Sequence, residues 1–254
     1  PGGLIRMAFT TKADFETRAL ARLAAVDAVF ETPLRTDYDL NPGWPAPVTA
    51  DFRRAAVLIG LIDRGDDYGV LLTLRPETMS SHAGQVAFPG GRLEPGESLL
   101  ETALREAHEE VGVDPPTVRV LGQGDTYLTG SGFAISPFVG VLPRDFTPVP
   151  HTSEVADVFE TPLSFLMNAA NHELHAREWK GVMREYYAMP WNDRYIWGVT
   201  AGMIRALQQR PLRRVADDRP ALYSWVWQGT HGKRAGAGPV LHARILRAGC
   251  RLVR

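Results

Sequence analysis

One stretch, Gly91 to Val113 (GRLEPGESLLETALREAHEEVGV), limits what this chain can fold into more than any other part of it. It follows directly on a Phe-Pro-Gly-Gly turn. Ser98, with Glu101 three residues later, has the form of a capping box, and Gly112 is a typical residue at a helix end. The stretch therefore predicts a loop that enters a helix over residues 98–111, closed by a glycine.

The charges on this helix crowd together, because residues three and four apart are neighbours on a helix surface. Glu106 therefore faces Glu109 and Glu110, and unpaired like charges at this spacing are destabilising. Arg105 can reach Glu101 or Glu109, but it cannot serve all three clustered glutamates. Carboxylate groups of this kind suit a hard divalent cation such as Mg²⁺ or Mn²⁺. The cluster predicts a metal site that handles phosphates.

A solvated face is the ordinary explanation for several glutamates on one helix. Here, however, the helix is entered from an apolar strand through Pro89, Gly90 and Gly91. Glycines at the end of a strand allow the backbone to approach a ligand closely. This context favours a ligand site over a merely solvated surface.

Hydrophobic spacing elsewhere favours an α+β layered fold over a doubly wound sheet, because hairpins replace a regular alternation of strands and helices. In chain order we expect a helix at 13–30, an irregular proline-rich segment at 31–51, a hairpin of strands at 54–63 and 70–75, a short strand at 85–88, the central helix at 98–111, strands at 117–129 and 133–142 with the second broken by Pro137, an apolar run at 155–163, a hairpin at 172–189 and a helix at 195–208.

Three regions follow: a lead segment with the first helix (1–49), the main domain (50–209) and a basic tail (210–254), expected to be peripheral or poorly ordered. With 28 basic and 29 acidic residues the chain is nearly neutral, so nucleic-acid binding by the whole chain is not expected. No apolar run reaches membrane-spanning length, and no signal-peptide core is seen. The lone Cys250 fits a reducing compartment, so we expect a cytoplasmic protein without membrane contact.

The stretch from Gly91 to Val113 resembles the Nudix box and matches each of its fixed positions, with Ala107 where many members carry a bulkier aliphatic residue. The resemblance implies the Nudix fold, an α/β/α sandwich with a mixed β-sheet and a loop–helix–loop. It also implies hydrolysis of a nucleoside diphosphate linked to another group.

The same resemblance implies roles for individual residues. It assigns divalent metal binding to Glu106, Glu109 and Glu110. It makes Arg105 and Glu97 the supporting pair that keeps the loop and the helix in shape.

The base that activates water is a separate question. A bound metal ion neutralises phosphate charge and lowers the pKa of water, and a carboxylate then takes the proton. Glu109 is one candidate. In some Nudix enzymes the base comes from a distant loop, which here indicates Glu154. The sequence leaves both open.

The flanking segments resemble the coenzyme A diphosphatases of this family, upstream at 71–75 and 82–91 and downstream at 153–163 and 196–201. The resemblance implies a small nucleotide substrate, coenzyme A or an acyl-CoA, cleaved to 3′,5′-ADP and 4′-phosphopantetheine or its acyl derivative. The residues expected to bind this substrate are Arg75, His82, Gln85, Gly90, Gly91 and Arg92.

Two departures keep other substrates open. Pro76 stands where the subgroup usually has serine or threonine, and Ser80 where a basic residue is common. ADP-ribose, NADH and modified nucleoside triphosphates are therefore alternatives. A third hypothesis is a Nudix-fold binding or regulatory module whose basic tail contacts a partner, although crowded carboxylates argue against it. An edge strand or the first helix would be the surface for a homodimer.

Overall fold

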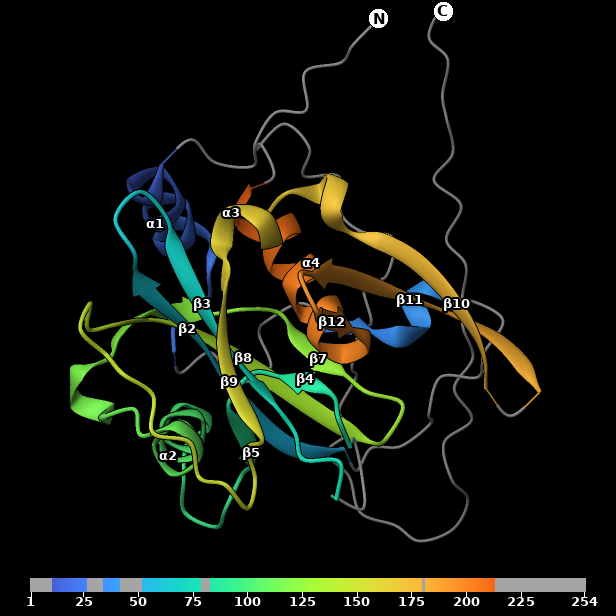
Figure 1. Cartoon of the computed structure of the whole chain (residues 1–254), viewed down its shortest axis with the longest axis horizontal. Coiled ribbons are helices and arrows are strands. Elements are labelled where there is room, and N and C mark those ends of the chain that lie inside the picture. Colours follow the sequence, from blue (N-terminus) through green and yellow to red (C-terminus); the bar gives the residue numbers. More distant parts are fainter. Residues whose placement is uncertain (1–10, 27–33, 42–51, 79–82, 180, 213–254) are drawn as a thin grey trace, which may run out of the picture. The chain divides into compact units, whose positions relative to one another are not determined.

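The computed structural model describes residues 11–26, 34–41, 52–78, 83–179 and 181–212 (Figure 1). The tail predicted at 210–254 lies outside the described residues beyond Leu212. Among the helices of the described part, none is both long enough and apolar enough to pass through a bilayer.

A mixed sheet forms the centre of the fold, and nine strands of the described residues belong to it. The path runs β1-β7-β8-β2-β3-β4, while β5 pairs with β2, β6 with β8 and β9 with β3. The longest strand, β2, is parallel to β8 and antiparallel to β3. The strand bounds are β1 Leu34–Thr36, β2 Arg53–Asp63, β3 Tyr68–Leu74, β4 Val86–Ala87, β5 Gly90–Arg92, β6 Arg119–Gln123, β7 Thr126–Leu128, β8 Phe133–Leu142 and β9 Asp157–Pro162.

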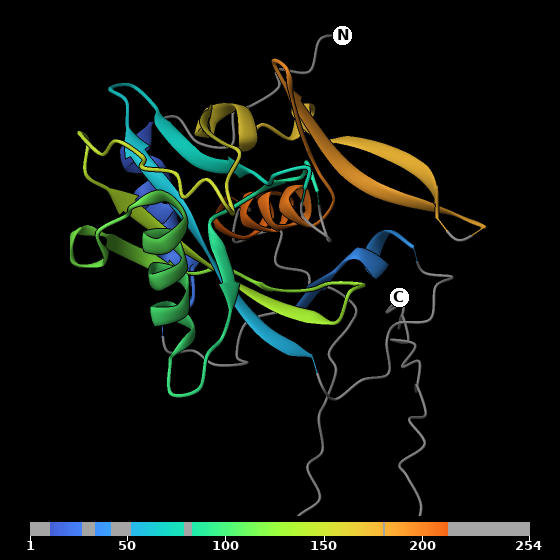
Figure 2. The same cartoon turned by 60° about the horizontal axis from the view of Figure 1, so that its bottom comes forward.

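Helices cover both faces of this sheet because β2 is apolar on both sides. Ile59 and Leu61 belong to the core shared with helices α1 and α4, whereas Leu58 and Ile62 belong to the core under α2. Each such buried side chain contributes about 1.5–3 kcal/mol. Figure 2 shows α2 and α4 on opposite faces, so the α/β/α sandwich is confirmed. The helix bounds are α1 Lys12–Arg22, α2 Leu99–Val111, α3 Leu163–Leu166 and α4 Gly198–Leu212, with short 3₁₀ turns η1 Asp37–Leu40, η2 Pro115–Thr117 and η3 Ala169–Asn171.

A second sheet lies beside α4 and contains three strands of the described chain: β10 Glu173–Trp179, β11 Val182–Trp191 and β12 Arg194–Trp197. Strands β10 and β11 confirm the hairpin predicted at 172–189. The last helix begins later than predicted, because Ile196 pairs with Met189 in β12 and is fully buried there. Gly198 turns the chain into α4 with a φ of 63°, so Trp197 ends a strand and does not lie on the helix.

The N-terminal predictions fail in two places. Helix α1 ends at Arg22 because Ala24 exchanges two backbone hydrogen bonds of 2.9 Å with Gln123 in an extended bridge. Residues 27–30 of the predicted helix lie outside the described residues. The segment predicted to be irregular contains β1, which pairs in parallel with β7, so residues 34–36 extend the main sheet.

Strand β8 runs through Pro137 without the predicted break. Its neighbour on one side changes from β7 to β6 at this point, and the Pro137 carbonyl accepts a 2.8 Å hydrogen bond from Gly124 between the two. The proline, which has no N–H to donate, therefore lies between the two stretches of β8 that pair with β6 and with β7.

Candidate active site

Helix α2 begins and ends as its sequence predicts. The Ser98 hydroxyl accepts from Glu101 N at 3.2 Å, and the Glu101 carboxylate accepts from Ser98 N at 2.7 Å. Gly112 closes the helix with a φ of 75°. Ala103 and Ala107 are fully buried against the sheet, and these small side chains let the helix lie close to β2. This packing fixes the rotation of α2 and thereby the direction of its glutamates.

The two glycines of β5 leave room for the carboxylates. A Cβ on Gly91 would lie 2.2 Å from Glu106 Oε1, so the Glu106 carboxylate occupies the space of an absent side chain. Gly90 N donates a 3.1 Å hydrogen bond to Glu110 Oε2. A Cβ on Gly90 would lie 2.4 Å from the carbonyl oxygen of Ala56 on β2. Glycine is therefore required at both positions, for different reasons.

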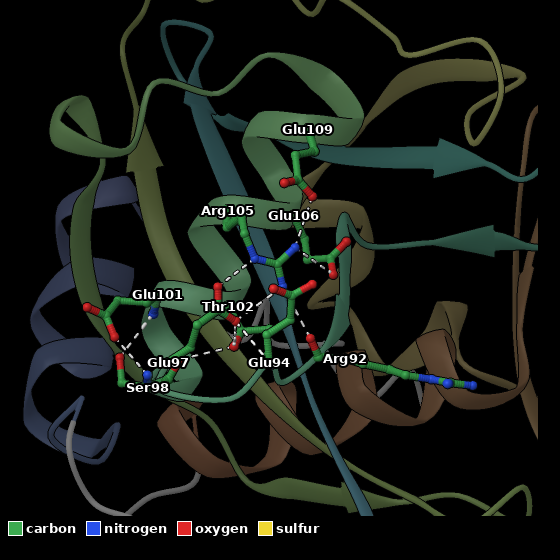
Figure 3. Close-up of polar contacts among 9 residues, drawn as sticks. All are labelled: Arg92, Glu94, Glu97, Ser98, Glu101, Thr102, Arg105, Glu106 and Glu109. Carbon is green, nitrogen blue, oxygen red and sulfur yellow. Dashed lines mark hydrogen bonds and ion pairs between the residues drawn. The ribbon is translucent and has the colours of Figure 1, made fainter.

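Arg105 connects the loop, the helix and β5 (Figure 3). Its Nε and Nη2 donate to the two carboxylate oxygens of Glu97 at 2.6 and 3.2 Å. Its Nη1 lies 2.9 Å from Glu109 Oε2 and 3.1 Å from Glu106 Oε1. Nη2 also donates to the Arg92 carbonyl at 3.2 Å. The expected pair of Glu97 and Arg105 is present, and Arg105 reaches two of the three clustered glutamates.

The carboxylates of the box differ in their electrostatics. The Arg105 guanidinium lowers the pKa of Glu97 to about 2. Burial raises the pKa of Glu110 to about 7, against the stabilising hydrogen bond from Gly90. Burial also raises the pKa of Glu106, although Arg105 opposes the shift. The helix thus holds two carboxylates whose negative charge is costly and incompletely neutralised.

Glu154 joins this group from a distant loop. His151 N donates to Glu110 O and Val149 N to Val111 O, both at 2.9 Å. These bonds satisfy carbonyls that the end of a helix leaves without partners. As a result, the charge of Glu154 is close enough to contribute to the raised pKa of both Glu106 and Glu110.

An open depression of about 430 Å³ lies at this junction, lined by His108, Glu109, His151 and Glu154. The His151 ring and Ser153 Oγ are hydrogen-bonded to each other at 3.0 Å. The sequence did not predict that His108 lines this site. Nothing in its local pattern indicates that the loop of His151 and Glu154 lies against this end of the helix. Its Nδ1 lies 2.9 Å from the Val113 carbonyl oxygen.

The carboxylate oxygens of Glu106, Glu109 and Glu110 are the kind of ligand that a hard divalent cation prefers. Gly90 and Gly91 beside them have no side chains that would fill the space of an ion. In the described part of the chain, no three acidic, histidine or cysteine side chains are already gathered closely enough to hold an ion. Arg105 instead holds Glu106 and Glu109. The Glu109 side chain is 54% exposed, so its carboxylate can turn towards an ion at little cost.

The expected substrate residues divide into groups. Arg75 N bonds Gln85 O at 3.0 Å, and Gly84 N bonds Arg75 O at 3.2 Å, which closes the loop at its base. The buried Nε of Arg75 has no hydrogen-bond partner among the described residues, and its charge opposes the raised pKa of Glu110. His82 lies outside the described residues. The Arg92 side chain points away from the carboxylates (Figure 3).

The downstream segment supports β4 from behind. Thr200 Oγ1 on α4 donates a 2.9 Å hydrogen bond to the Val86 carbonyl. Val155 is buried in the core beneath α2, and Leu163 is buried in the core on the opposite face. Thr200 therefore helps to hold β4 in place, whereas Val155 and Leu163 contribute to the two cores on either side of the sheet.

Comparison with known proteins agrees with this geometry. The family model of the NUDIX domain matches residues 51–187. The "Uncharacterized Nudix hydrolase NudL" of Yersinia enterocolitica is 39% identical over 174 residues, which cover 68% of this chain and 89% of that protein. A protein of the same name from Yersinia pestis (strain Pestoides F) is 39% identical over 163 residues, covering 64% of this chain and 81% of its own length.

Solved structures match more weakly. A Caenorhabditis elegans Ap4A hydrolase is 18% identical with a TM-score of 0.39, over 43% of this chain and 80% of that one. A MutT/nudix family protein from Enterococcus faecalis is 14% identical with a TM-score of 0.41, over 80% and 73%. At these values the alignments indicate nothing about substrate. The domain match and the identity to the Yersinia proteins nevertheless confirm the resemblance of the box, and the chain belongs to the Nudix hydrolase family.

Proposed function

We propose that this Nudix hydrolase cleaves the diphosphate of coenzyme A or its thioesters, with Mg²⁺ or Mn²⁺, to 3′,5′-ADP and 4′-phosphopantetheine or its acyl derivative. The observation that carries the hydrolysis is the packing of Glu106 and Glu110 against the side-chain-free backbone of Gly90 and Gly91. The coenzyme A assignment rests on the resemblance of the flanking segments at 71–75, 82–91, 153–163 and 196–201.

Glu106, Glu109 and Glu110 would hold the divalent ion, which supplies phosphate charge neutralisation and a water of lowered pKa when bound. The other residues position the reactants. The ion pair between Glu97 and Arg105 keeps the loop of the box against α2. The buried Nε of Arg75, which lacks a partner among the described residues, supplies a charged donor for a phosphate oxygen.

We assign the general base to Glu154. The Glu109 carboxylate already accepts a 2.9 Å hydrogen bond from Nη1 of Arg105. The Glu154 side chain forms no hydrogen bond or ion pair with another described residue, and it lines the same depression. Glu154→Gln should therefore lower kcat while leaving metal affinity unchanged, whereas Glu109→Gln should weaken metal affinity.

The test is incubation of the purified chain with coenzyme A and Mg²⁺ or Mn²⁺, followed by chromatography of the products. We expect 3′,5′-ADP in equal amount to 4′-phosphopantetheine, and no product from Glu110→Gln under the same conditions. A panel of ADP-ribose, NADH and modified nucleoside triphosphates measures preference by kcat/KM. Absence of 3′,5′-ADP at high enzyme concentration would reject coenzyme A as the substrate.

A second candidate substrate is another nucleoside diphosphate derivative, such as ADP-ribose or NADH. Pro76 favours it, because proline follows Arg75 where the subgroup usually offers a hydroxyl to an anionic substrate. A higher kcat/KM for one of these compounds than for coenzyme A would establish this alternative.

A further inference from the structure

Two arginines and one aromatic ring form a cluster on the face of the main sheet opposite α2. The guanidinium carbon of Arg53 lies 3.9 Å from the centre of the Phe133 ring, and that of Arg92 lies 5.3 Å from it. The strand register explains the cluster, because Arg53 pairs with Phe133 and Arg92 pairs with Ala55, two residues further along β2. These three side chains are called the Arg53–Phe133–Arg92 cluster below.

The positive charges of this cluster have no carboxylate partner in the described part of the chain. Arg53 Nη2 donates to the Ser131 carbonyl at 2.9 Å, and the Arg92 side chain forms no hydrogen bond or ion pair with a described residue. Several other arginines in the same part of the structure do pair with carboxylates. These are Arg18, Arg35, Arg64, Arg105, Arg119 and Arg194.

The ring orients both guanidinium groups. A cation over an aromatic face gains about 0.5–1 kcal/mol at an exposed site. That attraction restricts the rotamers of two long side chains, so less entropy is lost when they bind an anion. An arginine stem also covers exposed ring surface in many proteins. One arginine is enough for that purpose, and the second adds a charge that the described residues do not compensate.

The cluster lies one residue from the carboxylate site. Gly91 pairs with Ala56 and faces Glu106 on α2, and the next residue, Arg92, faces the other side of the sheet. Strand β5 pairs with β2 and lies at the edge of the sheet. A ligand whose diphosphate lies at Gly90 and Gly91 can therefore pass around this edge to reach Arg92 and Arg53.

We propose that the Arg53–Phe133–Arg92 cluster is the subsite for the 3′-phosphate of the nucleotide substrate. This proposal rests on the proposed function. A phosphate monoester on the ribose is separated from the 5′-diphosphate by a single sugar, which matches the neighbouring positions of the two sites around β5. Two guanidinium groups suit such a dianion because their N–H donors match phosphate oxygens. The cluster would select coenzyme A over ADP-ribose and NADH, which lack this phosphate.

The test compares kcat/KM for coenzyme A and for 3′-dephospho-coenzyme A in the wild type and in Arg53→Gln/Arg92→Gln. We expect the wild type to prefer coenzyme A and the double variant to lose about 10- to 100-fold of that preference, as expected when charged hydrogen bonds are removed. Arg177→Gln is the matched control, because it removes one charge from the exposed strand β10. It should keep the wild-type ratio. An unchanged ratio in the double variant would overturn the subsite.

A binding measurement separates this proposal from the proposed function. Calorimetry compares adenosine 3′,5′-bisphosphate with AMP on the wild type and the double variant, whose folding is checked by its Tm. We expect tighter binding of the bisphosphate by the wild type and loss of that difference in the variant. Equal affinities in the wild type overturn the subsite, even if coenzyme A is hydrolysed. A difference that depends on the two arginines supports it, even if coenzyme A is not hydrolysed.

Discussion

The two ends of helix α2 treat their carboxylates in opposite ways. Just before the first turn, Glu97 accepts hydrogen bonds from Nε and Nη2 of Arg105, and its pKa falls to about 2. At the last turns, burial raises the pKa of Glu110 to about 7. The ion pair of Glu97 stabilises the loop and the helix, whereas the burial of Glu110 disfavours its charged form. The comparison separates residues that maintain the shape of the site from residues suited to hold a cation.

Replacing the two buried carboxylates, Glu106 and Glu110, should have the largest effect on activity. Glu110→Gln and Glu106→Gln should each lower kcat by more than about 100-fold, the upper loss typical of residues that only support a metal ligand. Their free energy of unfolding without metal should stay equal or rise, because a buried charge is removed. Steady-state kinetics and urea denaturation in chelator measure both. Near wild-type kcat in Glu110→Gln would contradict its role as a ligand.

The two glycines of β5 allow an effect on stability to be separated from an effect on activity. Gly91→Ala places a methyl group where the Glu106 carboxylate lies, so it should lower kcat/KM about 10- to 100-fold with little loss of stability. Gly90→Ala instead meets the β2 backbone and should cost about 1–3 kcal/mol of unfolding free energy. Kinetics and denaturation on both variants measure this. Equal loss of stability in the two would show that Gly91 is required for packing alone.

A smaller effect concerns pH. The folded pKa of Glu97 is depressed, so its stabilising contribution is present above its ordinary pKa of 4.5 and is lost as pH falls towards about 2. The difference in unfolding free energy between wild type and Glu97→Gln should therefore shrink across this window. Denaturation series in chelator measure it. Glu94→Gln, on the same loop, is the control and should follow the wild type. A constant difference down to low pH would contradict the ion pair.

Local signals in the sequence predicted the helix of the site correctly. The capping box of Ser98 and Glu101 and the terminal Gly112 act within a few residues, so spacing alone locates them. The end of α1 was mispredicted because the extended conformation after Arg22 depends on pairing with Gln123, far along the chain. The parallel pairing of β1 with β7 is long-range in the same way.

The arrangement of the site shows the same limit. Gly91, Arg105 and Glu106 are brought together by one loop and one helix, so their proximity follows from the sequence. The meeting of Arg53 with Phe133 depends on a parallel register between β2 and β8, which no local pattern specifies. The sequence predicted that Arg92 binds substrate but not the face of the sheet on which its side chain lies. Because neighbouring residues of a strand point to opposite faces, Arg92 lies on the face opposite to the one on which Gly91 meets Glu106.

The docking of the 149–155 loop on the last turn of α2 has a mechanical consequence. Val149 and His151 are hydrogen-bonded to helix carbonyls, and Val149 lies where a side chain on Gly112 would be, with a Cβ there only 3.2 Å from Val149 Cβ. The loop that carries Glu154 is therefore fastened to the helix that carries Glu106, Glu109 and Glu110. A substitution that shifts the end of α2 should for this reason also displace Glu154, although the two lie more than 40 residues apart in the chain.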